Sequence, residues 1–152
     1  MYPSDEVEKE RVPLKPALGL KSFVTYVKEI GAGEEISYGG TYVTERTMRI
    51  ATVPVGYGDG YPRSLSNRGY VLILGRVCMD QFMVDVTDIS DVCVDTPVTL
   101  IGKDGDEEIS MERLAELCGG FHYEMVCDIG KRVPRVYYRG GKVVGTMDCF
   151  AE

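Results

Sequence analysis

The sequence predicts a mainly β fold: a compact antiparallel barrel of Greek-key-like type with one or two short helices. Three observations lead to this prediction. Short runs of alternating apolar and polar residues recur along the chain, glycine-rich turns separate them at regular spacing, and few segments have a helical period. A barrel is favoured over an open sheet because closure removes exposed strand edges.

The first strand is expected to begin at Leu20, where apolar and polar residues start to alternate, and to end in a turn at Gly31 and Gly33. The other strands follow the same pattern. They are expected over residues 47–55, 70–74, 76–86, 97–101, 135–139 and 142–147. Gly140 and Gly141 predict a hairpin between the last two strands.

One helix is clearly marked. Ser110 is a suitable N-cap, residues 111–118 place apolar side chains at three-to-four-residue spacing, and Gly119 provides a stop. A second, shorter helix is expected over residues 123–128.

Composition indicates one acidic globular domain. The 152 residues include 17 Lys and Arg against 24 Asp and Glu, a net charge of −7, with 44% hydrophobic residues. A chain of this size buries a single core. The acidic balance argues against nucleic acid as a partner. No apolar run approaches the roughly 20 residues of a membrane helix, and residues 1–14 are too charged for a signal peptide, so we expect a cytoplasmic protein.

The residues of classical metal and nucleophile sites are sparse. The five cysteines lack paired metal-ligand spacing and an even disulfide count, so we expect buried free thiols and no metal. The single histidine, His122, has no nucleophile motif around it and is expected to be a satisfied structural residue near a helix start.

Three segments could carry function. Residues 36–42 and 55–63 are expected to be loops in which glycines flank a tyrosine. Such loops let the backbone approach a ligand and present a phenol, although similar tyrosines also simply cover turns. Residues 75–81 mix Arg, Asp and Gln with apolar residues, which indicates a polar network or an interface at one end of the barrel, or else an ion-paired strand end.

These segments, in this order, resemble the carboxy-terminal domain of bacterial alanine racemases, the pyridoxal-phosphate enzymes that interconvert L- and D-alanine. The resemblance covers nearly the whole chain. Its motifs are Leu14-Lys15-Pro16-Ala17 with Lys21-Ser22, Ser37-Tyr38-Gly39, Val55-Gly56-Tyr57-Gly58-Asp59-Gly60, Gly75-Arg76-Val77-Cys78-Met79-Asp80-Gln81 and Arg132-Val133-Pro134-Arg135.

The resemblance implies a two-part isomerase that supplies D-alanine for peptidoglycan. An amino-terminal α/β barrel would carry pyridoxal phosphate on a lysine, and residues 1–15 would lead from it into the β domain, residues 16–152. In such homodimers the β domain of one subunit closes the barrel of the other. The fragment would then be inactive alone, because Lys28, Lys103 and Lys142 look like solvated positions rather than a cofactor amine.

The resemblance also assigns residue roles. Tyr38 matches the catalytic tyrosine, which exchanges the substrate α-proton on the face opposite the cofactor lysine. Tyr57 matches a tyrosine that lines the substrate entrance, and Met79 matches a residue whose backbone N–H holds the substrate carboxylate.

Arg63 and Arg76 match charged residues of the outer entrance. Lys131 stands where several relatives have a tyrosine that binds the cofactor phosphate. This departure leaves open a serine or broad-specificity racemase. An alternative from another class is a non-catalytic binding or dimerisation module.

Overall fold

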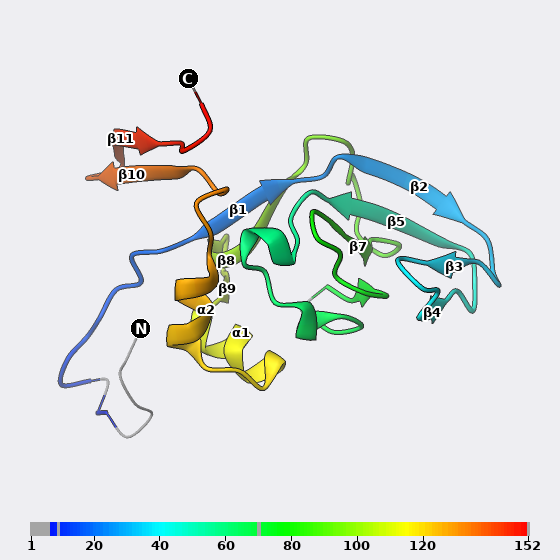
Figure 1. The fold of residues 1–152 in the computed structure, drawn as a ribbon, viewed down its shortest axis with the longest axis horizontal. Coiled ribbons are helices and arrows are strands. Elements are labelled where there is room, and N and C mark those ends of the chain that lie inside the picture. Colours follow the sequence, from blue (N-terminus) through cyan, green and yellow to red (C-terminus); the bar gives the residue numbers. More distant parts are fainter. Residues whose placement is uncertain (1–6, 9, 70, 152) are drawn as a thin grey trace.

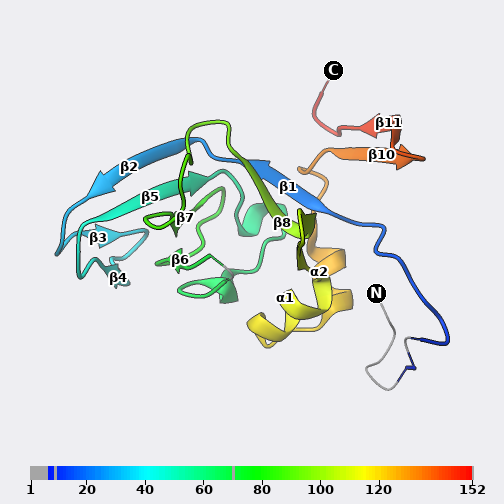
Figure 2. The same cartoon turned by 180° about the vertical axis from the view of Figure 1, so that it is seen from behind.

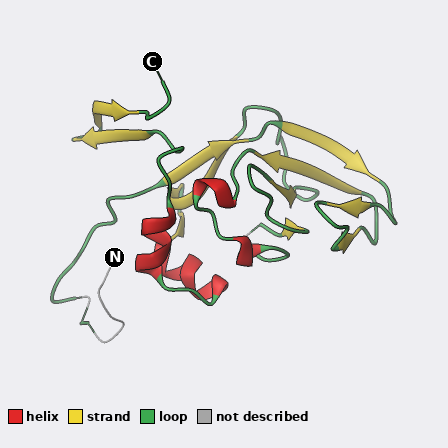
Figure 3. Ribbon diagram, viewed as in Figure 1, coloured by secondary structure: helices red, strands yellow, loops and turns green. Residues whose placement is uncertain are grey.

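A computed structural model describes residues 7–8, 10–69 and 71–151, and shows a mainly β chain with two helices (Figures 1 and 3). The strands are β1 Leu20–Phe23, β2 Tyr26–Ile30, β3 Glu35–Ile36, β4 Tyr42–Val43, β5 Met48–Val53, β6 Ile73–Leu74, β7 Phe82–Asp85, β8 Pro97–Asp104, β9 Glu107–Ile109, β10 Arg135–Arg139 and β11 Lys142–Met147. The helices are α1 Met111–Cys118 and α2 His122–Asp128, with 3-10 turns η1 Tyr57–Asp59 and η2 Arg63–Leu65.

The strands pair in antiparallel fashion. One sheet has the order β2-β5-β7-β6, a second has the order β1-β8-β9, and β3–β4 and β10–β11 are separate hairpins. The mainly β antiparallel class with two helices is therefore confirmed, whereas closure into a single barrel stays a prediction. Residue 70 of the expected strand 70–74, and residues 1–6 and 9 of the expected lead-in, lie outside the described residues.

The first expected strand is divided into β1 and β2, because the chain changes sheets at Val24. The Val24 amide donates to the Thr96 carbonyl at 2.9 Å, and the next amide, that of Thr25, donates to the Thr52 carbonyl at 2.9 Å. The side chain of Val24 is buried at the change-over. Alternation in the sequence continues through this point, so the sequence pattern alone does not mark the break.

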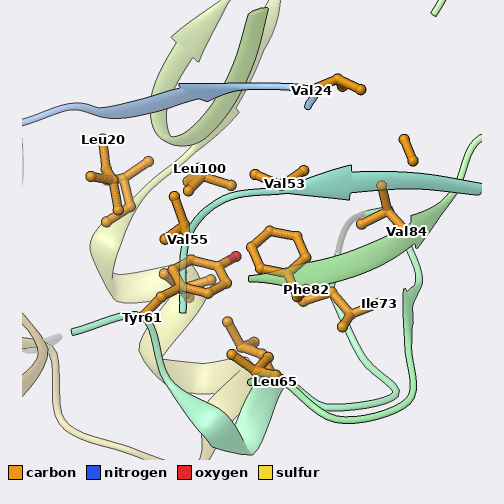
Figure 4. Close-up of a cluster of buried hydrophobic side chains, with 14 of the residues drawn as sticks. Leu20, Val24, Val53, Val55, Tyr61, Leu65, Ile73, Phe82, Val84 and Leu100 are labelled. Carbon is orange, nitrogen blue, oxygen red and sulfur yellow. The ribbon is translucent and has the colours of Figure 1, made fainter. Parts of the chain in front are cut away.

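The core lies between the four-stranded sheet and the segment that contains η2 (Figure 4). Tyr61 and Phe82 stack with their ring centroids 5.2 Å apart, and Leu65 is fully buried beside them. Burial raises the pKa of the Tyr61 phenol well above its usual value, and the neighbouring Cys118 adds to the rise. Tyr61 is therefore a neutral core residue.

The expected strand over residues 76–86 is wrong in its first half, since only Phe82–Asp85 is a strand. Residues 76–81 form a tight turn, in which the Cys78 amide donates to the Gln81 carbonyl at 2.9 Å. The reason is long-range pairing: the carbonyls of Cys78 and Met79 accept amides from η1. The short strands of β3, β4 and β9 were not expected either, and β8 runs to Asp104 rather than to residue 101.

Both helices are confirmed. Ser110 caps α1, its side chain accepting from the Arg113 amide at 3.1 Å, and Gly119 ends the helix with φ 64°. α2 begins at His122, one residue before the expected start. Figures 2 and 3 show the two helices side by side, below the strands, and they contact each other.

Two predictions about single residue types are corrected. The cysteines are free as expected, but Cys93, Cys127 and Cys149 are exposed and the other two are half-buried. Half-buried Cys118 packs against the core, whereas Cys93, Cys127 and Cys149 lie on the surface. His122 is not satisfied: its Nε2 is buried and has no hydrogen-bond partner within the described residues, and its ring contacts the rings of Phe121 and Tyr123.

The hairpin β10–β11 projects from the body near the end of the chain (Figures 1 and 2). Its Gly140-Gly141 turn is as predicted. Tyr137 and Tyr138 are 50% and 67% exposed, although neighbouring residues of a strand point to opposite faces. Neither face of the hairpin is therefore covered, and several more apolar side chains along it are exposed, namely Val136, Val143, Val144 and Met147.

Candidate active site

The three segments singled out in the sequence meet in the structure. The loop that carries Tyr38 is tied to the turn at residues 76–81, and this turn is tied to η1, which carries Tyr57. A fourth segment, residues 129–132, also contacts η1. Together they form the candidate site, which we call the loop cluster.

The Tyr38 loop joins β3 to β4 and is held from the side. Ser37 has a positive φ of 67°, and its hydroxyl donates to the Arg76 carbonyl at 2.7 Å. The guanidinium of Arg76 lies close to Gly39, since a Cβ at Gly39 would be 3.0 Å from Arg76 Nη1. The ring of Tyr38 is 76% exposed on this anchored loop. The loop therefore presents the phenol outward from a fixed backbone.

η1 fixes Tyr57 by backbone pairing. The amides of Tyr57 and Gly58 donate to the carbonyls of Cys78 and Met79 at 3.0 and 2.9 Å. Gly56 is buried so close to that turn that a Cβ would overlap both of these carbonyl oxygens. Glycine is required here by close approach rather than by φ, which is an extended −149°. Tyr57 is 46% exposed at the rim.

Met79 lies at the tip of the turn and is 52% exposed. Its carbonyl accepts from Gly58, but its own N–H has no acceptor within residues 7–8, 10–69 and 71–151. An unpaired backbone N–H in an exposed turn is able to bind an anionic oxygen of a ligand. This arrangement is compatible with the carboxylate-binding role that the resemblance implies.

Arg132 connects two parts of the loop cluster, and the sequence analysis did not single out its side chain. Its Nη2 donates to Asp80 Oδ1 at 2.5 Å, and its Nε lies 3.5 Å from Asp59 Oδ1. The hydrogen bond to Asp80 and the charge of Asp59 raise the pKa of Arg132. Asp80 lies two residues before β7, so these contacts fit both a polar network and an ion-paired strand end. The signal for Arg132 in the sequence was a carboxylate in each of two motifs, Asp59 and Asp80, because neighbouring carboxylates are stabilised by a nearby cation.

The three residues expected at the substrate entrance are not equally close to the loop cluster. Arg76 is half-buried within it, and Lys131 is exposed next to Arg132. Arg63 is exposed on η2, which is linked to the cluster through Ser66: the Ser66 hydroxyl donates to the Arg63 carbonyl and accepts from the Val77 amide. Neither Arg63 nor Lys131 forms an ion pair with any residue that the structure describes.

Two cavities of the described structure lie away from the loop cluster. One, of about 290 Å³, is lined by core residues such as Val53, Phe82 and Val84. The other, of about 280 Å³, lies between residues 14–18 and the start of α1. Tyr38, Tyr57 and Met79 line neither of them. The loop cluster is therefore an exposed surface, as expected for one wall of a site whose other walls lie elsewhere.

Comparisons with known proteins bear on this interpretation. A family model described as alanine racemase, C-terminal domain, matches residues 17–137. The chain belongs to this family. It is 47% identical over 150 residues to an alanine racemase of Clostridium perfringens (strain SM101), covering 94% of this chain and 39% of that protein. It is 53% identical over 133 residues to one of Halothermothrix orenii, covering 83% of this chain and 35% of that protein.

Solved structures of the family agree with the fold. Alanine racemase from Bacillus anthracis with bound L-Ala-P superposes with a TM-score of 0.87 at 42% identity, over 97% of this chain and 40% of that one. The Clostridium difficile 630 enzyme in complex with cycloserine superposes with a TM-score of 0.89 at 38% identity, over 99% and 41%. The chain thus spans about two-fifths of the length of the relatives it matches.

Within the described ranges no group of three or more His, Cys, Asp or Glu residues is arranged to hold a metal ion. No helix in that part of the chain has the length and apolar character needed to cross a bilayer.

Proposed function

We propose that this chain is the active-site-completing domain of an alanine racemase, and that residues 16–152 form the domain while residues 1–15 lead into it. The observation that carries the proposal is the convergence of the Tyr38 loop, η1 and the Met79 turn in a chain of this family. The match to the family model begins at residue 17, which supports the domain boundary.

The proposed cofactor is pyridoxal phosphate, held mainly by a barrel domain outside this chain. When bound, it supplies the electron sink that acidifies the substrate α-hydrogen. The described lysines do not fit the role of the cofactor amine, because such an amine is desolvated and all of them are exposed. These lysines are Lys15, Lys21, Lys28, Lys103, Lys131 and Lys142. Exposed Lys131 is a cation available to the cofactor phosphate at the entrance.

In the proposed reaction, this chain supplies the proton-transfer group of one face. Tyr38 takes the α-proton of alanine on its oxygen as the phenolate, or returns a proton as the phenol, and the group for the other face belongs to the barrel. The unpaired Met79 N–H holds the substrate carboxylate, and Tyr57 lines the entrance. Arg63 and Arg76 attract the carboxylate through their positive charge. The substrate pair is L- and D-alanine.

The proposed partners are a barrel domain and a second subunit, in a cytoplasmic homodimer. The uncovered hairpin β10–β11 supports a partner for this surface. Isolated two-stranded hairpins are marginally stable in water, and large exposed apolar patches mark interaction sites. The exposed Tyr38 ring supports the same conclusion, since proton transfer requires a site from which water is excluded.

The experiment is a chimera in which this chain replaces the matched segment of the Clostridium perfringens alanine racemase. Tyr38→Phe in the chimera is expected to lower turnover by about 10²–10⁴-fold in the direction that uses this base, with the cofactor absorbance retained. The matched control is Tyr26→Phe, because Tyr26 is an exposed strand tyrosine remote from the loop cluster. Equal rates for both variants would remove Tyr38 from the mechanism and favour a non-catalytic module.

A further inference from the structure

We propose that Arg132 is a positioning residue: it clamps η1 to the Met79 turn and, together with the two backbone hydrogen bonds between them, holds Tyr57 in place relative to Met79. The kinetic part of this inference rests on the proposed function. Its structural part concerns only contacts within this chain.

The clamp has two acidic ends. Asp59 closes η1 by accepting from the Gly56 amide through Oδ2 at 2.9 Å, which leaves Oδ1 facing Arg132 Nε. Asp80 follows Met79 and accepts from Arg132 Nη2. Without a cation between them, two carboxylates on adjacent turns would repel each other. Arg132 therefore links the segment that carries Tyr57 to the segment that carries Met79.

The guanidinium also packs on the backbone between these ends. A Cβ on Gly58 would overlap Arg132 Nη1, so the guanidinium occupies the space that a side chain at Gly58 would fill. From this position a planar guanidinium can contact both carboxylates, whereas the compact ammonium of a lysine can form a close ion pair with only one of them. This explains why the residue is arginine.

A second arginine, Arg135, fixes the backbone of the loop that carries Arg132. Arg135 donates to the carbonyls of Ile129, Gly130 and Val133 at 2.9, 3.2 and 2.6 Å, and so fixes the shape of residues 129–133. The Gly130 amide in turn donates to the Asp59 carbonyl at 3.2 Å. The loop that presents Arg132 is thus attached to η1 independently of the clamp, and we expect it to stay in place when the Arg132 side chain is removed.

The first test uses this chain alone and measures amide hydrogen exchange. Arg132→Gln is expected to speed exchange of the Tyr57 and Gly58 amides by about fivefold, the effect of losing a half-exposed charged contact, while amides of β5 keep their protection. Asp80→Asn is expected to have the same effect, and the double variant no more than either single one. The control is Lys103→Gln, which removes one charge from a remote exposed pair. Unchanged exchange, or additive effects in the double variant, would overturn the clamp.

The second test uses the chimera with the Clostridium perfringens protein. Arg132→Gln is expected to raise KM for alanine by about fivefold with a smaller change in kcat, and Arg132→Lys to restore part of the loss. A purely structural role would lower thermal stability and leave KM unchanged, which would overturn the positioning role. An inactive parent chimera would contradict the proposed function, whereas the exchange measurement would still decide whether the clamp exists.

Discussion

Gly56→Ala should separate the two turns that build the loop cluster. The added Cβ would overlap the carbonyl oxygens of Cys78 and Met79, and both are backbone atoms that cannot rotate away. The φ of −149° suits alanine, so the effect is steric rather than conformational. Overpacking of this kind costs about 1–3 kcal/mol. The two hydrogen bonds that the Tyr57 and Gly58 amides donate to this turn would also lengthen. Each of them contributes about 0.5–1.5 kcal/mol to stability.

We therefore expect Gly56→Ala to lower the free energy of unfolding by about 2–6 kcal/mol, measured by urea denaturation with a single slope m. Gly31→Ala is the matched control, because nothing lies within 4 Å of a Cβ there and its φ is not positive. That change should be neutral or stabilise by up to about 1 kcal/mol. If both variants had the same midpoint, the close approach of η1 to the Met79 turn would be refuted.

Two further predictions concern a backbone contact and a buried phenol. Met79→Leu nearly conserves volume and leaves the N–H in place, so KM for alanine in the chimera should change by less than about twofold; a large rise would show that the side chain makes the contact. Tyr61 has a raised pKa in the folded chain, so its phenol ionises from about pH 10 only when unfolded. The contribution of the neutral Tyr61 phenol to the free energy of unfolding is complete below that pH. Above it, this contribution should fall by up to about 1.4 kcal/mol per pH unit. Tyr61→Phe should remove this share of the alkaline slope in denaturation curves, and an unchanged slope would contradict the assignment.

Local patterns account for the elements that could be predicted from the sequence. α1 depends on a cap at Ser110, an apolar period and a glycine stop, and β10–β11 on a two-glycine turn. All of these signals lie within or next to their own element, so they are readable without knowledge of the rest of the fold. The family resemblance added expected roles for Tyr38, Tyr57 and Met79, which local patterns do not give.

The failures come from long-range contacts. Residues 76–81 have a strand-like composition, but their backbone groups pair with η1, and no local pattern records that pairing. The change of sheets at Val24 has the same cause, because it depends on Thr96 and Thr52. The contacts of the Arg132 side chain could not be predicted, because its partner Asp80 lies 52 residues away in the sequence. The exposure of the cysteines likewise depends on which face the fold turns outward.

The most direct test of the central claim is the racemisation of L-alanine in the presence of pyridoxal phosphate, measured for this chain alone and for the chimera with the Clostridium perfringens protein. The account predicts no turnover by the chain alone and turnover by the chimera, because the cofactor amine lies outside this chain and Tyr38 lies within it. Turnover by the chain alone would contradict the account, as would a folded chimera that binds the cofactor and fails to racemise alanine.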